Sequence, residues 1–157
     1  MRWLLLLLLV FLCRPSAAQV TASDWGAMCF PQGGGAGVRM CQLVTEFTVR
    51  DGRGRFRGAV RLLRSETGLA DALISGDREI TSGSLQIDAG PAVQCDPGYD
   101  CKLDQAEAVA LQGGVKSGEY LIVRFAPRGM APVAFSLRLD GARRAVAGVT
   151  ELERQGW

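Results

Sequence analysis

The residues best suited to chemistry are four arginines and one phenylalanine that fall within eight positions, 50–57. Guanidinium groups pair bidentately with phosphate, sulfate and carboxylate groups. Similar segments contact RNA, where arginines and aromatic rings stack on bases. The interspersed glycines are also typical of a solvated loop between two strands, which is the plain alternative. We take the candidate residues for contact with an anionic ligand or partner to be Arg53, Arg55, Phe56 and Arg57.

The absence of histidine limits the enzymatic mechanisms open to this chain. No His occurs in the 157 residues, which excludes Ser-His and Cys-His nucleophile pairs and every zinc site that contains histidine. The 16 Asp and Glu residues leave one alternative, a hydrolase with paired carboxylates, although the sequence does not bring any two together. Lys116 and Ser117 are adjacent, so on a strand they would point to opposite faces. We therefore expect a non-catalytic protein.

Three aspartates with four-residue spacing, Asp96, Asp100 and Asp104, could in principle hold calcium. The EF-hand pattern is absent around them, because its glycine and its final glutamate have no counterpart at the required positions. Acids in a loop and a helix cap explain these residues more simply. We expect no metal ion and no cofactor.

The first 18 residues have the layout of a secretory signal peptide. Arg2 is followed by 11 apolar residues at 3–13, and Ser16 and Ala18 supply small residues before a cleavage site. A membrane anchor would need about 20 apolar residues, and Arg14 ends the run well short of that. We expect cleavage after residue 18, export to the periplasm or the extracellular space, and no transmembrane segment in the mature chain.

Removal of the signal changes the charge of the protein. Without Arg2 and Arg14 the 18 basic residues fall to 16, which equals the number of acidic residues. A neutral chain gives no general attraction to nucleic acid or to an anionic membrane. We therefore expect no nucleic-acid partner, and the arginine-rich segment is a local feature of a neutral domain.

Four cysteines remain after cleavage, and an even number in an exported chain indicates two disulfides. Three pairings are possible. The short separations favour Cys29 with Cys41 and Cys95 with Cys101. A zinc site is the alternative, but neither pair has CxxC-like spacing.

Apolar residues alternate with polar ones over most of the mature chain, as half-buried strands require. Strands are expected at 25–30, 41–50, 59–63, 84–88, 120–125 and 133–139. Two helices interrupt them. Asp104 and Glu107 resemble a capping box at the start of a short helix over 105–112, which Gly113 and Gly114 would end. An amphipathic pattern after Asp140 predicts a C-terminal helix.

This pattern predicts an all-β fold, mainly an antiparallel β-sandwich or a partly open barrel, with the two helices added. No linker or internal repeat divides the mature chain. We therefore expect one disulfide-containing domain over residues 19–157.

Short motifs follow one another in a fixed order around the cysteines. They are Asp24-Trp25 before Cys29, CQLV at 41–44, GSLQID at 83–88 before Cys95 and Cys101, KSG at 116–118 and FSL at 135–137. Together they resemble the invasion-associated locus B family of small exported bacterial proteins, over most of the mature chain. The resemblance implies an all-β domain in the periplasm or outer-envelope space, with two local disulfides and no known catalysis.

The family carries no functional residues that can be transferred, because the matching positions are cysteines and core residues. Trp25 is interpreted as a core aromatic beside the Cys29 disulfide, and a ligand-stacking ring is the alternative. We expect an exported binding or envelope-interaction module whose partner is a protein or an anionic component of the envelope or of a host surface. A hydrolase and a purely structural envelope component are the alternatives.

Overall fold

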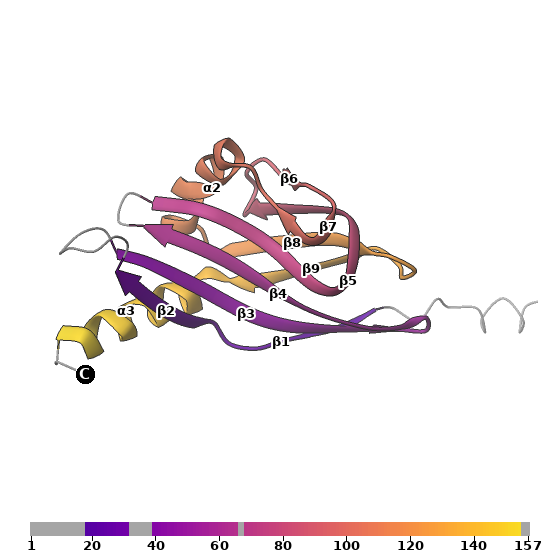
Figure 1. Cartoon of the computed structure of the whole chain (residues 1–157), viewed down its shortest axis with the longest axis horizontal. Helices are drawn as coiled ribbons and strands as arrows, with labels where there is room; N and C mark the ends of the chain where they lie inside the picture. The colour runs from indigo at the N-terminus through magenta and orange to yellow at the C-terminus, as the bar shows by residue number, and fades with distance from the viewer. Residues whose placement is uncertain (1–17, 32–38, 66–67, 155–157) are drawn as a thin grey trace, which may run out of the picture.

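The computed structural model describes residues 18–31, 39–65 and 68–154. This part of the chain forms nine antiparallel strands and two helices (Figure 1). The strands are β1 (Gln19–Ala22), β2 (Gly26–Pro31), β3 (Arg39–Asp51), β4 (Gly54–Ser65), β5 (Gly68–Ile87), β6 (Val93–Cys95), β7 (Gly98–Lys102), β8 (Tyr120–Pro127) and β9 (Val133–Arg138). The helices are α2 (Gln105–Ser117) and α3 (Leu139–Arg154). The expected signal peptide, 1–18, lies outside the described residues except for Ala18.

The strands form one sheet in the order β1-β3-β4-β5-β8-β9, which curves until it is nearly closed. The predicted fold class, an antiparallel sandwich or partly open barrel with a short central helix and a C-terminal helix, is confirmed. β2 pairs with the first part of β3, whose last part pairs with β1, and β6 and β7 pair with β5. Among the described residues no helix is long and apolar enough to span a membrane.

β5 forms the corner of this sheet. Its first part pairs with β4, where Ser75 lies opposite Ala59, and its second part pairs with β8, where Leu85 lies opposite Val123. The strand changes neighbours between Gly76 and Ile80. A single long strand therefore belongs to both halves of the fold, and the core lies between these halves.

Four phenylalanines from four strands meet in the core. The ring centroids of Phe47 and Phe135 are 4.9 Å apart, and those of Phe56 and Phe125 are 5.1 Å apart. Tilted aromatic pairs at such distances add stability beyond their buried area. The Phe56 ring lies against Gly76 of β5, where an added Cβ would lie 2.1 Å from the ring.

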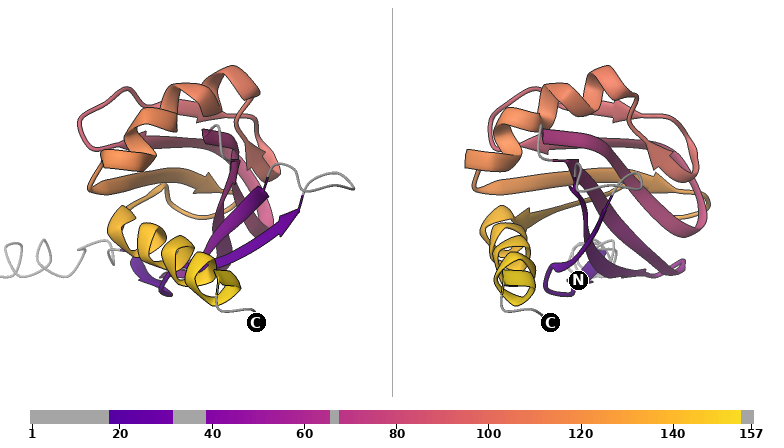
Figure 2. Two further views of the ribbon diagram at one scale, coloured as in Figure 1. Left: turned by 90° about the vertical axis from the view of Figure 1, so that its left-hand side faces the viewer. Right: turned by 60° about the vertical axis from the view of Figure 1, so that its left-hand side comes forward.

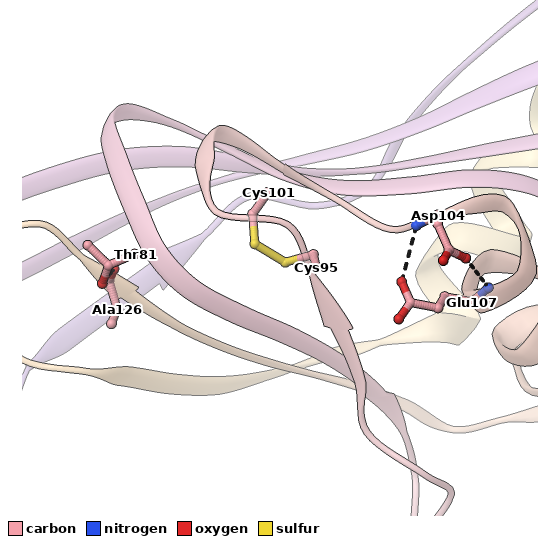
Figure 3. The surroundings of a disulfide bond; sticks show 6 residues. All are labelled: Thr81, Cys95, Cys101, Asp104, Glu107 and Ala126. Atoms are coloured by element: carbon pink, nitrogen blue, oxygen red, sulfur yellow. Dashed lines mark hydrogen bonds between the residues drawn. A yellow bond between two sulfur atoms is a disulfide. The ribbon is translucent and has the colours of Figure 1, made fainter.

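Both predicted disulfides are confirmed. Cys29 and Cys41 lie directly opposite each other on β2 and β3, and Cys95 and Cys101 join β6 to β7 (Figure 3). The second disulfide packs on β5 at Gly83, where a Cβ would come within 2.6 Å of the Cys101 Sγ. The two disulfides indicate folding in an oxidising environment.

α2 begins as predicted and ends later than predicted. The Asp104 carboxylate accepts a hydrogen bond from the Glu107 backbone N–H, and the Glu107 carboxylate accepts one from the Asp104 N–H (Figure 3). The helix runs on to Ser117 and is capped by Gly118. Gly114 lies within the helix and against Ile87, where a Cβ would come within 2.9 Å of Cγ2. Here glycine permits close packing of helix on strand.

α3 lies away from α2 (Figure 2) and packs against β2 and β3, and residues of both helices belong to the same core. Ala142, Ala145 and Val146 form the side of the helix that contacts the core. Trp25 also packs against the core and donates a hydrogen bond from Nε1 to the Arg138 carbonyl, at 3.0 Å. The indole therefore ties the segment between β1 and β2 to the end of β9.

Candidate functional site

The predicted arginine-rich loop is a hairpin, and only its tip is a turn. β3 and β4 pair without a break from Met40 opposite Ser65 to Asp51 opposite Gly54. The Asp51 carboxylate accepts a hydrogen bond from the Arg53 N–H at 2.7 Å, which is the main reason that the pKa of Asp51 is lowered. Arg53 therefore occupies the turn, whereas Arg55 and Arg57 stand on a regular strand. The loop prediction is corrected because cross-strand hydrogen bonds hold this segment.

Phe56 is not a contact residue. Its side chain is 0 % exposed and lies in the core with Phe47 and Phe125. Successive strand residues point to opposite faces, so Arg55 and Arg57 face solvent and the residue between them faces inward. Its assignment to an anionic ligand is corrected for this reason, and its role is to anchor the strand that carries the arginines.

Sequence reasoning missed one residue of this surface, Arg61. It is exposed and belongs to the same outward set of β4 as Arg55 and Arg57. The sequence contained a signal for it, because Arg61 follows Arg57 by four residues and Arg55 by six, and evenly spaced residues of a strand point to the same face. Arg61 lies outside the arginine-rich segment 50–57 and on the separately predicted strand 59–63, whereas β4 continues through Gly58 and joins the two.

The three arginines border a hollow on the outer face of β1, β3, β4 and β5, with a volume of about 790 Å³. Ala59 faces outward but is only 7 % exposed, because the longer side chains around it cover it. Ser75, directly opposite Ala59, is also a small outward residue, so no large side chain fills the space above this pair. The lining is Thr21, Ala22, Ser23, Glu46, Phe47, Thr48, Arg55, Arg57, Gly58, Ala59, Arg61, Ser75 and Gly76. This set is named the arginine hollow.

The charge of the arginine hollow is positive. Glu46 is the single acidic residue in its lining. Within the described parts of the chain, no carboxylate lies within 4.0 Å of the guanidinium of Arg55, Arg57 or Arg61. The hydroxyl side chains of the lining, Thr21, Ser23, Thr48 and Ser75, add neutral hydrogen-bonding groups. Together these groups can bind an anion that also carries hydroxyls.

The end of β4 that carries two of the arginines is held by β5 through side chains. Beyond Gly58 opposite Gly76, β5 leaves the ladder. The Asp77 carboxylate accepts a hydrogen bond from the Arg57 N–H at 3.1 Å, and Arg78 Nη2 donates to the Arg55 carbonyl at 2.9 Å. These bonds fix the backbone, so the Arg55 and Arg57 side chains start from defined positions.

The acidic residues that the structure describes form no comparable site. Asp104 is the cap of α2, as predicted, and the described residues contain no group of three or more possible metal ligands. Two carboxylates, Asp51 and Asp140, have a lowered pKa. A glycosidase needs a carboxyl group with a raised pKa as its general acid, and neither of these two meets that need.

Comparison of the chain with protein-family models, with curated proteins and with solved structures gives no match. The function is therefore inferred from the geometry and charge of the arginine hollow and from the signal-like and cysteine motifs of the sequence.

Proposed function

We propose that this chain is an exported, non-catalytic protein of the invasion-associated locus B family that binds an anionic component of the cell envelope or of a host surface through the arginine hollow. One observation carries the proposal. Arg55, Arg57 and Arg61 stand on the outward side of one strand, above small residues, with no carboxylate within ion-pairing distance in the described structure. Unpaired guanidinium groups in a hollow are available to carboxylate, sulfate or phosphate groups.

Export and location are part of the proposal. The signal-like residues 1–18 and the two disulfides support a mature protein in the periplasm or the extracellular space. The order of motifs around the cysteines supports the family assignment. In that compartment nucleic acid is a rare ligand, whereas anionic glycans and acidic protein surfaces are common.

Binding is favoured over hydrolysis by the chemistry of the hollow. A hydrolase that uses two carboxylates needs both of them beside the same bond. Glu46 has no second acidic residue with it in the lining of the arginine hollow. The hollow therefore supplies groups that hold an anion, and it does not supply a general acid and a nucleophile.

The test compares two double variants of equal charge. Arg55→Gln with Arg57→Gln alters the hollow, and Arg124→Gln with Arg128→Gln removes two arginines elsewhere, one of which pairs with Glu79. We expect the first variant to bind immobilised polygalacturonate about tenfold more weakly, at roughly 0.7 kcal/mol for each exposed charge contact. The second variant should bind as wild type does. Equal weakening in both variants would show a general charge effect and overturn the assignment to this hollow.

A further inference from the structure

A second hollow adjoins the arginine hollow, and Ser23 lines both. It has a volume of about 560 Å³ and lies between the β1–β2 connection and the start of α3. Its lining is Ser23, Asp24, Trp25, Leu137, Arg138, Asp140, Gly141, Arg144 and Ala145. This set is named the tryptophan groove. The two hollows meet at Ser23, just after the end of β1, and together form an extended surface.

The boundary between the hollows is firmly held. The Ser23 N–H donates to the Glu46 carbonyl at 2.8 Å, and the Glu46 N–H donates to Ser23 Oγ at 3.0 Å. The buried Thr45 hydroxyl donates to the Ser23 carbonyl at 2.8 Å. Three hydrogen bonds therefore fix the residue over which a ligand would pass.

Trp25 presents a fixed aromatic surface to the groove. Its Nε1 is held by the Arg138 carbonyl, and its ring lies against Gly141, where an added Cβ would be 3.1 Å from Cδ1. The side chain is half-buried, so part of the indole remains accessible. Leu137 and Ala145 add apolar surface beside it. Such a surface suits the C–H face of a sugar ring, which packs on aromatic side chains.

Polar groups stand beside this aromatic surface. Asp140 pairs with Arg144 at 2.7 Å and with Arg138 at 3.2 Å, and these two arginines lower the pKa of Asp140 to about 2, mainly through the hydrogen bond from Arg144. Both guanidinium groups stay largely exposed, Arg144 at 74 %. Each retains further N–H donors for hydroxyl or carboxylate oxygens.

We infer that the ligand is an acidic polysaccharide that contacts the arginines of β4, crosses β3 beside Glu46 and passes over Ser23 into the tryptophan groove. This inference rests on the proposed function and names its ligand class. A strand rises about 3.3 Å per residue, so Arg55 and Arg61 are about 20 Å apart along β4. A single anion cannot reach both, whereas a chain of acidic sugars can. A polyphosphate offers charge to the arginines but no C–H face to Trp25.

The experiment uses the full chain with Trp3→Phe and Trp157→Phe, in which Trp25 is the only tryptophan. The probes are galacturonic acid, its dimer, tetramer and octamer, and a linear polyphosphate of matched charge. We expect the octamer to bind at least 100-fold more tightly than the monomer and to shift the Trp25 emission. Polyphosphate should bind without that shift.

The outcomes separate this inference from the proposed function. If the octamer binds no more tightly than the monomer, or binds without an emission shift, the extended glycan site is wrong while anion binding stands. An equal emission shift with polyphosphate would overturn the choice of a sugar ligand. If no anionic probe binds, the proposed function fails as well.

A second variant tests the groove without altering the core. Arg144→Gln removes an exposed guanidinium from the tryptophan groove, and Arg128→Gln removes one from a distant ion pair. We expect Arg144→Gln to weaken octamer binding about fivefold and dimer binding by less than twofold, with no change for Arg128→Gln. Equal affinities of the two variants for the octamer would overturn the extension into the groove.

Discussion

The arginines at the start of α3 and those on β4 both face solvent, and the two regions differ in what the guanidinium groups contact. At the junction of β9 and α3, Arg138 and Arg144 share the carboxylate of Asp140. On β4, Arg55 and Arg57 have no carboxylate partner in the described structure. The first group secures the start of a helix, and the second is the one to which we assign binding in the proposed function. The same residue type is therefore expected to serve structure or binding according to the acids around it.

The two regions also differ in how an aromatic ring packs on a glycine. At Gly76 an added Cβ would lie 2.1 Å from the Phe56 ring, in the core beneath the arginine hollow. At Gly141 the corresponding distance to Trp25 is 3.1 Å, near the surface. A buried ring cannot move without disturbing its neighbours, while a half-buried ring can shift by a few tenths of an ångström.

The largest effect on stability is expected from replacing these two glycines with alanine. Gly76→Ala should lower the free energy of unfolding by about 3 kcal/mol, since it overpacks the core at Phe56. Gly141→Ala should cost less than about 1 kcal/mol, because alanine favours the helix and offsets the closer contact with Trp25. Urea denaturation followed by circular dichroism measures both values.

Gly148→Ala is the control for helix propensity, since nothing lies within 4 Å of a Cβ at this position of α3. This variant should raise stability by about 0.5 to 1 kcal/mol. Equal losses for Gly76→Ala and Gly141→Ala would contradict the contrast between a buried and a half-buried ring.

Much of the fold could be predicted from the sequence, because local pattern and local structure agree over most of the chain. Alternation placed the strands around Phe47, Leu85 and Val123, and the short cysteine separations favoured the observed disulfides. The capping residues Asp104 and Glu107 marked the start of α2. Each of these signals acts within a few residues.

The failures come from features that depend on distant contacts. The first half of β5 was missed, because Gly76 and Asp77 are typical of turns and the strand bends there between two partners. Gly114 was taken as a helix stop, although it serves packing on Ile87. Phe56 was assigned to binding because the hairpin was interpreted as a loop, in which the alternation of faces does not apply.

The candidate site was only partly predictable for the same reason. The arginines at 53–57 were found from composition, but the hollow depends on which strands lie beside β4. Ser75 comes from β5 and Ser23 from the segment after β1. No local pattern connects these residues with Arg61, because the sheet register brings them together.

An intermediate effect on the Tm is expected when the pH is lowered. It should appear at the ion pairs of Asp140 and be absent at the arginines of β4. The pKa of Asp140 falls from 3.8 to about 2 on folding, so its ion pairs stabilise the protein above pH 4 and this contribution is lost as the pH falls toward 2. Asp140→Asn should therefore lower the Tm at pH 6. The difference in Tm from wild type should shrink between pH 4 and pH 2.

The double variant Arg55→Gln with Arg57→Gln is the comparison for this measurement, because neither side chain pairs with a carboxylate in the described structure. Its Tm should follow that of wild type across the same pH range. Scanning calorimetry at several pH values measures both variants. A Tm difference for Asp140→Asn that stays constant down to pH 2 would show that its ion pairs do not stabilise the helix start.

The smallest effect should come from Glu46, the one acidic residue that lines the arginine hollow. Its side chain is exposed on β3, directly opposite Ala59, so its carboxylate would repel a bound anion. Glu46→Gln removes that repulsion while the backbone N–H that donates to Ser23 Oγ remains. Exposed charge interactions contribute about 0.5 kcal/mol, so the octamer of galacturonate should bind two- to threefold more tightly.

Asp71→Asn provides the control for this last measurement, because its carboxylate pairs with Lys102 outside the hollow and carries the same charge as Glu46. Titration at low and high salt should show the gain for Glu46→Gln at low salt only, since salt screens interactions between exposed charges. If Asp71→Asn gives an equal gain, the anion responds to the charge of the whole protein. A gain confined to Glu46 would instead locate the bound anion beside Ala59, between Arg57 and Arg61 of β4.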